Sequence, residues 1–165
     1  MTIIDLFKKQ LEEEAATTRK MLERIPAEQF TWKPHEKSMD LLRLATHVAE
    51  LPSWITMTME TDQLDFAENE YKPEEINSTE QLNLYFEKNL KKGKASLESA
   101  TEPQLEKPWT LRNGDQIYST SPKGDVLRMS LSQIIHHRAQ LGVYLRLLNI
   151  PIPGSYGPSA DEMEF

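Results

Sequence analysis

The segment from residue 125 to residue 149 constrains the fold of this chain more than any other. Its apolar side chains recur at alternating spacings of four and three, in the series Leu127, Leu131, Ile134, Leu141, Leu145 and Leu148, with Arg138 in the middle. This spacing gathers the side chains on one face of an α-helix, because a helical turn takes about 3.6 residues. We expect a long amphipathic helix that ends before Pro151 and buries its apolar face against other helices.

Three further segments show the same helical period. Their apolar positions are Ile4, Phe7, Leu11, Ala15, Thr18, Leu22 and Ile25 in the first, Leu41, Leu42, Leu44, Ala45, Val48 and Leu51 in the second, and Leu82, Tyr85, Phe86 and Leu90 in the third. Proline ends or bends a helix, so we expect boundaries at Pro26 and Pro103 and a kink at Pro52. The chain of 165 residues is long enough for one domain. The sequence therefore predicts a single all-α four-helix bundle over residues 1–165.

The connections between these helices differ in kind. Asn113 and Gly114 lie between two short segments of strand-forming residues, which predicts a short β-hairpin over residues 109–119, before the last helix. Residues 61–79 are acidic and polar, and we expect a solvated loop there. The tail from residue 151 is rich in proline and glycine, which predicts an extended strap that packs back on the bundle through Ile152 and Tyr156.

The composition limits the classes of function. The chain has 19 lysines and arginines against 26 acidic residues, a formal net charge of -7, which disfavours the basic surface that nucleic-acid binding requires. It has no cysteine, so disulfides and thiolate metal sites are excluded. No apolar run approaches the roughly 18 residues of a membrane span, and the N-terminal residues lack a signal-peptide pattern. We expect a cytoplasmic protein without nucleic-acid or membrane partners.

The histidines are the side chains best suited to bind a metal. Three of them, His47, His136 and His137, fall in predicted helices. His137 lies roughly 60° from the centre of the apolar stripe, whereas His136 lies on nearly the opposite side. Gln133 precedes His137 by one turn, so its amide oxygen can converge with that imidazole as an auxiliary ligand. His47 lies at the edge of its own apolar face. His47 and His137 could share a divalent transition metal, although such a histidine is more often a structural residue.

Arg138 interrupts the apolar stripe of the last predicted helix. A charge at that position is costly unless it is paired, so we expect a buried ion pair, with Glu50 as the candidate partner, rather than a catalytic role. The serines and threonines occur in no strand–turn–helix setting, and no glycine-rich phosphate loop is present. The pattern of residues therefore assigns no catalytic nucleophile.

Three stretches, taken together, resemble the DinB family of the DinB/YfiT-like superfamily. They are LATHVAE at residues 44–50, IHHRAQL at residues 135–141 and YGPSADE at residues 156–162. The resemblance implies a four-helix bundle, often a homodimer, that holds a divalent metal with one histidine of the second helix and a histidine pair of the last helix. Carried over, these ligands are His47 and His137, and the earlier member of the pair is replaced by Gln133. Water and Gln133 could complete a weaker site, His136 could swing in, or the metal could be lost.

The resemblance also implies a class of reaction. It is a metal-dependent transferase or hydrolase that uses zinc or nickel and acts on a small molecule, with a low-molecular-weight thiol as a candidate co-substrate, in a bacterial stress response. The alternative is a non-catalytic, stress-induced bundle that binds a small ligand or a protein partner, in which the histidines only pack. DNA binding ranks last, because the net charge opposes it.

Overall fold

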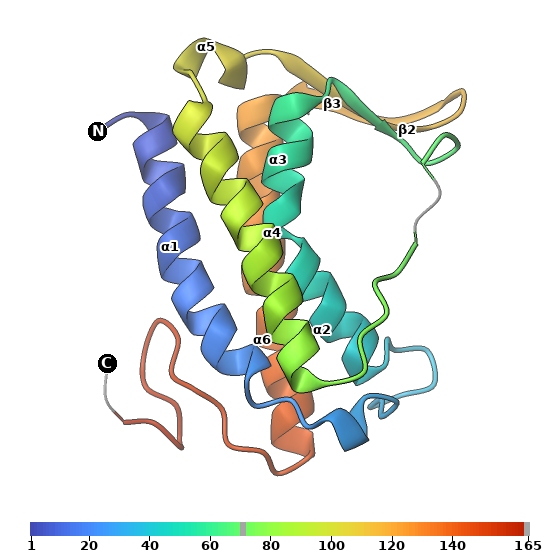
Figure 1. Cartoon of the computed structure of the whole chain (residues 1–165), viewed down its shortest axis with the longest axis vertical. Helices are drawn as coiled ribbons and strands as arrows, with labels where there is room; N and C mark the ends of the chain where they lie inside the picture. The colour runs from blue at the N-terminus through green and yellow to red at the C-terminus, as the bar shows by residue number, and fades with distance from the viewer. Residues whose placement is uncertain (70–71, 164–165) are drawn as a thin grey trace.

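The computed structural model describes residues 1–69 and 72–163 (Figure 1). The described residues form six α-helices, one 3-10 helix and three short strands. In chain order these are α1 (Ile3–Leu22), η1 (Ala27–Gln29), α2 (Leu41–Glu50), α3 (Pro52–Glu60), β1 (Gln63–Asp65), α4 (Thr79–Ser99), α5 (Glu102–Leu105), β2 (Pro108–Asn113), β3 (Gln116–Pro122) and α6 (Lys123–Leu147). The chain is therefore mostly helical, as the periodicity predicts, with a small sheet added.

The long helices pack around one apolar core. α6 contacts α1, α2 and α3, and α4 contacts the same three helices from another side (Figure 1). The stripe predicted on α6 supplies five side chains that are at most 2% exposed, namely Leu127, Leu131, Ile134, Leu141 and Leu145. Burial of such side chains is the main force that stabilises helices of this length. The apolar spacing of the sequence thus identifies the core face of α6 correctly.

The second helical segment is divided at Pro52. α2 begins after Asp40, whose carboxylate accepts a hydrogen bond from the amide of Arg43, and it ends at Glu50. Pro52 occupies the first turn of α3, where its missing N–H costs nothing. α4 passes close to this junction, because a Cβ added at Gly93 would lie 2.5 Å from the carbonyl oxygen of Pro52. A glycine is therefore required where α4 crosses the start of α3.

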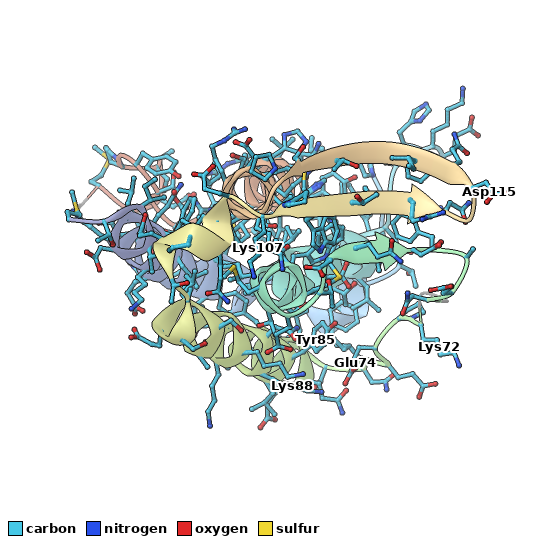
Figure 2. All side chains as sticks on the ribbon, turned by 90° about the horizontal axis from the view of Figure 1, so that it is seen from above. Lys72, Glu74, Tyr85, Lys88, Lys107 and Asp115 are labelled. Atoms are coloured by element: carbon cyan, nitrogen blue, oxygen red, sulfur yellow. The ribbon has the colours of Figure 1, made fainter. Side chains whose placement is uncertain are left out.

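The sheet is larger than the predicted hairpin. β2 and β3 pair antiparallel, and β1 pairs parallel to β2, so the order is β1-β2-β3. Figure 2 shows the hairpin running from Lys107, near the helices, out to Asp115 at its tip. The expectation of a wholly solvated loop over residues 61–79 is wrong at Asp65, which is 5% exposed. Its carboxylate accepts hydrogen bonds from the amides of Ala67 and Gly114, and these bonds lower its pKa.

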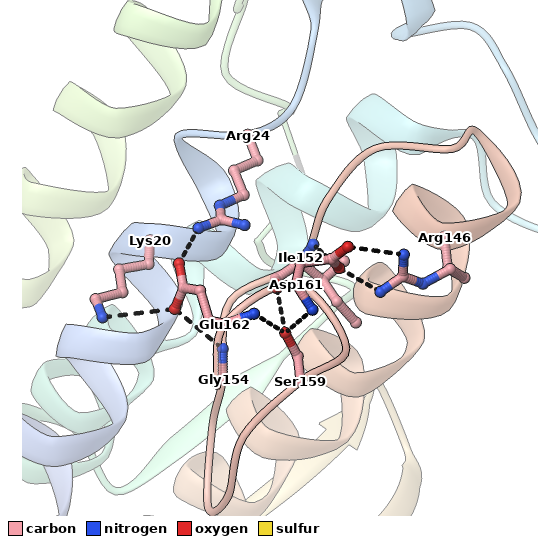
Figure 3. A network of polar contacts seen from close by, with 8 residues as sticks. All are labelled: Lys20, Arg24, Arg146, Ile152, Gly154, Ser159, Asp161 and Glu162. Carbon is pink, nitrogen blue, oxygen red and sulfur yellow. Dashed lines mark hydrogen bonds and ion pairs between the residues drawn. The ribbon is translucent and has the colours of Figure 1, made fainter. Parts of the chain in front are cut away.

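The C-terminal tail packs back on the helices without regular structure. Ile152 packs against the core, and Asp161 accepts a hydrogen bond from the Ile152 amide at 3.0 Å and pairs with Arg146 of α6 (Figure 3). Glu162 pairs with Arg24, at the end of the first helical segment. Ion pairs on both sides thus hold the predicted strap between α1 and α6.

The partner predicted for Arg138 is wrong. Arg138 pairs with Glu14 of α1, with Nη2 2.6 Å from Oε2, and not with Glu50. The spacing of residues on α6 shows that Arg138 is buried, but it cannot show which helix faces it. Glu14 is itself only 4% exposed, so its carboxylate lies inside the protein, one turn from the apolar position Leu11 of α1.

Candidate metal and ligand site

The structure brings the two predicted ligand histidines together. His47 lies near the end of α2 and His137 lies in the middle of α6. Their ring centroids are 4.6 Å apart, with the ring planes inclined at 75°. Both residues are half-buried, at the edge of the apolar contact between α2 and α6. Two imidazoles from separate helices therefore meet at a position that solvent can still reach.

Each of these imidazoles has an acceptor at its Nδ1 atom. Oε1 of Glu50 lies 2.7 Å from Nδ1 of His47, and Oε1 of Gln140 lies 3.0 Å from Nδ1 of His137. An oxygen that only accepts favours the tautomer in which Nδ1 carries the proton. The lone pair then resides on Nε2 of both rings. Metal-binding histidines characteristically have this arrangement, in which a carboxylate or carbonyl oxygen holds the second ring nitrogen.

His136 and Gln133 lie beside the pair. The His136 ring centroid is 4.9 Å from that of His137, but His136 is exposed and its Nε2 lies 3.1 Å from the amide nitrogen of Gln140. Gln140 thus contacts both neighbouring histidines, donating to one and accepting from the other. Gln133 lines the same shallow hollow of α6 as His136 and His137.

Partial burial changes the proton affinity of His137. Desolvation is the largest cause that lowers its pKa below the usual 6.5, and the positive charges that His47 and His136 can carry lower it further. The hydrogen bond that His137 donates to the amide oxygen of Gln140 opposes the change. A lowered pKa keeps the imidazole neutral at pH 7. Only the neutral ring offers a lone pair to a metal or accepts a proton from a substrate.

The donor set fits a metal in part. Because a zinc–nitrogen bond is about 2.1 Å long, two imidazoles that share one ion have ring centroids roughly 5 Å apart, close to the separation seen here. Within residues 1–69 and 72–163, however, no group of three histidine, cysteine or acidic side chains has the geometry of a metal site. The fit is therefore to two imidazole ligands, with an amide such as Gln133 or water in the remaining positions.

A cleft of about 560 Å³ opens beside His47. Its polar lining includes Arg43, His47, Glu50, Ser53, Asn69 and Lys72, and its apolar lining includes Trp54, Met57, Leu64, Phe66 and Tyr85. Figure 2 shows Tyr85 on α4 and Lys72 on the segment that leads to α4. A concave surface with an apolar wall and a few polar groups is typical of a small-molecule site. The His47 and Glu50 side chains can therefore act on a ligand bound in this cleft.

A second groove, of about 580 Å³, lies between α6 and the tail. Its lining is mainly apolar, and its charged side chains, Arg138 and Arg146, are paired with Glu14 and Asp161. Among the described residues that line this groove, there is no histidine and no carboxylate that could act as a base. The cleft beside His47 is therefore the better candidate for chemistry, although the two hollows have similar volumes.

Comparison with known proteins agrees with this arrangement of helices. The model of the DinB family matches residues 2–164. The chain belongs to the DinB family. A DinB-like protein from Bacillus subtilis has a similar solved structure, with a TM-score of 0.71 and 19% identity over 96% of this chain and 99% of that one. A DinB-like protein from Bacillus cereus ATCC 10987 gives a TM-score of 0.71 and 19% identity over 91% and 95% of the two chains.

These similarities establish the DinB-like fold of the chain. The search of curated proteins found no match to the sequence. In the part of this DinB family member that the structure describes, no helix is long and apolar enough to cross a membrane.

Several residues of the site are missing from the sequence-based prediction. Glu50 and Gln140 each follow one of the two predicted ligand histidines by three residues, about one helical turn, and this spacing is the signal that could have identified them. Met57 also lines the cleft. Leu64 and Phe66 carry no signal, because only the pairing of β1 with β2 brings them to the cleft.

Proposed function

We propose that this DinB family protein is a metal-dependent enzyme, a transferase or hydrolase acting on a small molecule, built on a four-helix bundle. His47 and His137 hold a divalent ion, zinc or nickel, and Gln133 with water completes the coordination. The observation that carries the proposal is the close pair of imidazoles, with ring centroids 4.6 Å apart. The Nδ1 atom of each ring has an oxygen acceptor, from Glu50 at 2.7 Å and from Gln140 at 3.0 Å.

The residues of the chain have separate tasks in this proposal. Glu50 and Gln140 fix the orientation and tautomer of the two rings. The side chain of Glu50 is only 12% exposed, so bulk water competes little for its contact with His47. The bound ion supplies Lewis acidity that activates a thiol or a water near neutral pH. The apolar wall of the cleft excludes bulk water from a bound substrate, which strengthens the polar interactions there.

Metal content tests the proposal directly. Untagged protein is stripped with chelator, reloaded with zinc, nickel or manganese, dialysed and analysed by plasma mass spectrometry. We expect about one ion per chain, lost in His47→Ala and in His137→Ala, and an affinity lowered about 10- to 100-fold in Glu50→Gln. His35→Ala is the matched control, because His35 is exposed in the connection before α2. An empty wild type, or equal loss in His35→Ala, would refute the metal site.

Activity is tested on the loaded protein. Hydrolysis of p-nitrophenyl esters and transfer of small thiols to 1-chloro-2,4-dinitrobenzene are followed by absorbance, before and after chelation. We expect one of the two reactions to depend on the metal and on both His47 and His137. Metal binding without either reaction would refute both proposed reaction classes. It would leave the proposed metal ligands standing.

A second candidate function is ligand binding without catalysis. The observation that favours it is Gln133, which replaces the histidine that the family resemblance implies at that position. In this case the two imidazoles only pack, and the cleft binds a small molecule in the stripped protein. Absence of metal after reloading, combined with ligand binding that survives His137→Ala, would support this candidate over the enzyme.

A further inference from the structure

We propose that Asn113 is a site of spontaneous deamidation, and that the contact between Asp65 and the Gly114 amide suppresses this reaction in the folded protein. Asn113 and Gly114 are the pair that predicts the hairpin, and the proposed function assigns no role to either residue. The inference is independent of a metal and of the cleft beside His47. It concerns a chemical modification at the tip of the β2–β3 hairpin, which Asp115 marks in Figure 2.

Deamidation at an Asn–Gly pair is an intramolecular substitution. The main-chain nitrogen of Gly114 loses its proton and attacks the side-chain carbon Cγ of Asn113. The new nitrogen–carbon bond forms, the Cγ–Nδ2 bond breaks, and ammonia leaves with the proton, which gives a cyclic imide. Water then opens the ring at one of its two carbonyl groups, and the product is aspartate or isoaspartate. Water is the only co-reactant, and glycine favours the reaction because it has no side chain to hinder the attack.

The hairpin retains this reactive pair for a structural reason. Asn113 is the last residue of β2 and is exposed, so water reaches its side chain. It pairs with Gln116, so the loop consists of Gly114 and Asp115 alone. Gly114 has a φ of +57°, a conformation that favours glycine. A larger residue would slow deamidation but strain the turn.

Asp65 restrains the attacking nitrogen. Its Oδ1 atom accepts the N–H of Gly114 at 2.8 Å and the N–H of Ala67 at 2.9 Å. An amide anion at Gly114 would face a carboxylate at hydrogen-bond distance, so the negative charge of Asp65 opposes the loss of this proton. The same two amides lower the pKa of Asp65, which keeps it ionised and makes it a weak base. Asp65 therefore protects the Gly114 amide and does not deprotonate it.

Arg112 restrains the next peptide group. Its Nε and Nη2 atoms donate to the carbonyl oxygen of Gly114 at 2.7 and 2.5 Å, and Nε lies 3.3 Å from Oδ2 of Asp65. The extended backbone of β2 turns the Gly114 nitrogen away from Cγ of Asn113, so the peptide group between them must rotate before the attack. That rotation breaks the bond to Asp65. The hairpin therefore keeps Asn113 in an unreactive geometry.

The modification should loosen β1 from the hairpin. Isoaspartate adds one methylene group to the main chain before Gly114, and it places a new carboxylate beside the amide that Asp65 holds. The amide of Phe66 donates to the carbonyl oxygen of Arg112 at 3.0 Å, so the exchange rate of this amide reports the pairing of β1 with β2. We expect faster hydrogen exchange at Phe66 in the deamidated molecules.

Mass spectrometry on aged protein tests the inference. Wild type, Asp65→Ala, Asp65→Asn and Arg112→Gln are incubated side by side at mildly alkaline pH, and conversion of Asn113 to aspartate and isoaspartate is followed by peptide mapping. We expect Asp65→Ala to deamidate about tenfold faster than wild type, because it loses a charge-assisted hydrogen bond. Asp65→Asn, which keeps an acceptor without the charge, should lie between the two. Arg112→Gln should show a smaller acceleration than Asp65→Ala.

Three references separate a local effect from unfolding. Asn77 and Ser78 form a second reactive pair before α4, where Asn77 is exposed, and the rate at Asn77 should not change in Asp65→Ala. Asn113→Gln should remove the signal at the hairpin. A free peptide of residues 109–119 gives the unrestrained rate, which should exceed that of wild type about tenfold or more.

Three results would overturn the inference. Equal rates in the peptide and in wild type would show that the fold gives no protection. A slower reaction in Asp65→Ala than in wild type would show that Asp65 acts as a base. Equal acceleration at Asn77 would show that Asp65 acts only through overall stability. None of these measurements involves metal content, so this inference and the proposed function can fail separately.

Discussion

Arg138 of α6 and Glu14 of α1 form an ion pair in the protein interior, with Nη2 and Oε2 separated by 2.6 Å and side chains only 4% and 5% exposed. The same guanidinium donates to the carbonyl oxygen of Glu14 at 3.0 Å and to the hydroxyl of Thr18 at 3.2 Å. The hydroxyl of Tyr156 donates to the other carboxylate oxygen of Glu14. One buried pair therefore joins the first helix, the last helix and the tail.

Removing one partner of this pair should strongly destabilise the protein. Arg138→Ala leaves the Glu14 carboxylate buried without its counter-charge, and the expected loss is about 3–5 kcal/mol in the free energy of unfolding, measured with urea. The double variant Glu14→Met/Arg138→Met should recover much of that loss, because no charge remains unpaired. A loss no larger than that of Arg128→Ala, at an exposed pair, would contradict the importance of burial.

Gly93 should not tolerate a side chain. A Cβ at this position would lie 2.5 Å from the carbonyl oxygen of Pro52, a backbone atom that can move only with α3. We expect Gly93→Ala to lower stability by about 1–3 kcal/mol in thermal or urea unfolding. Gly142→Ala is the control, because the nearest atom is the flexible end of Met21 at 3.5 Å. That variant should be neutral or more stable, since alanine favours helix by about 0.5–1 kcal/mol.

The lowered pKa of His137 predicts a pH dependence of stability. In the window just below 6.5, the unfolded state binds more protons at this residue than the folded state does, because burial lowers the folded pKa. This contribution to stability is therefore present above about pH 6.5 and is lost as the pH falls through the folded pKa. Unfolding followed from pH 5 to pH 8 should show a slope that decreases in His137→Ala. A proton NMR titration midpoint at or above 6.5 would contradict the assignment.

The tail should detach from the helices when Asp161 and Glu162 lose their negative charges. The pKa of Asp161 is lowered by its contact with Arg146 and by the amide of Ile152, and the pKa of Glu162 by the Gly154 amide. In Asp161→Asn/Glu162→Gln these attractions are weakened, so limited proteolysis should cleave residues 151–163 faster while the thermal midpoint changes little. The control is Asp125→Asn, an acidic residue at a surface pair on α6. Equal cleavage rates in the two variants would argue that packing alone holds the tail.

The sequence by itself determined the helices and the two histidines. Helical periodicity depends on residues three and four apart, so the core face of α6 and the break at Pro52 are local properties that can be read without a structure. The positions of His47 and His137 at the edges of apolar faces follow from the same spacing. The family resemblance also rests on short local stretches.

Only the tertiary structure decided which faces meet. Glu14 rather than Glu50 pairs with Arg138, β1 joins the hairpin, and Leu64 and Phe66 reach the cleft. Each of these relationships joins residues far apart in the chain, and the energy that selects it comes from burial and charge pairing between elements. A local pattern shows that a side chain must be covered or paired, but only the packing of the whole chain decides by what.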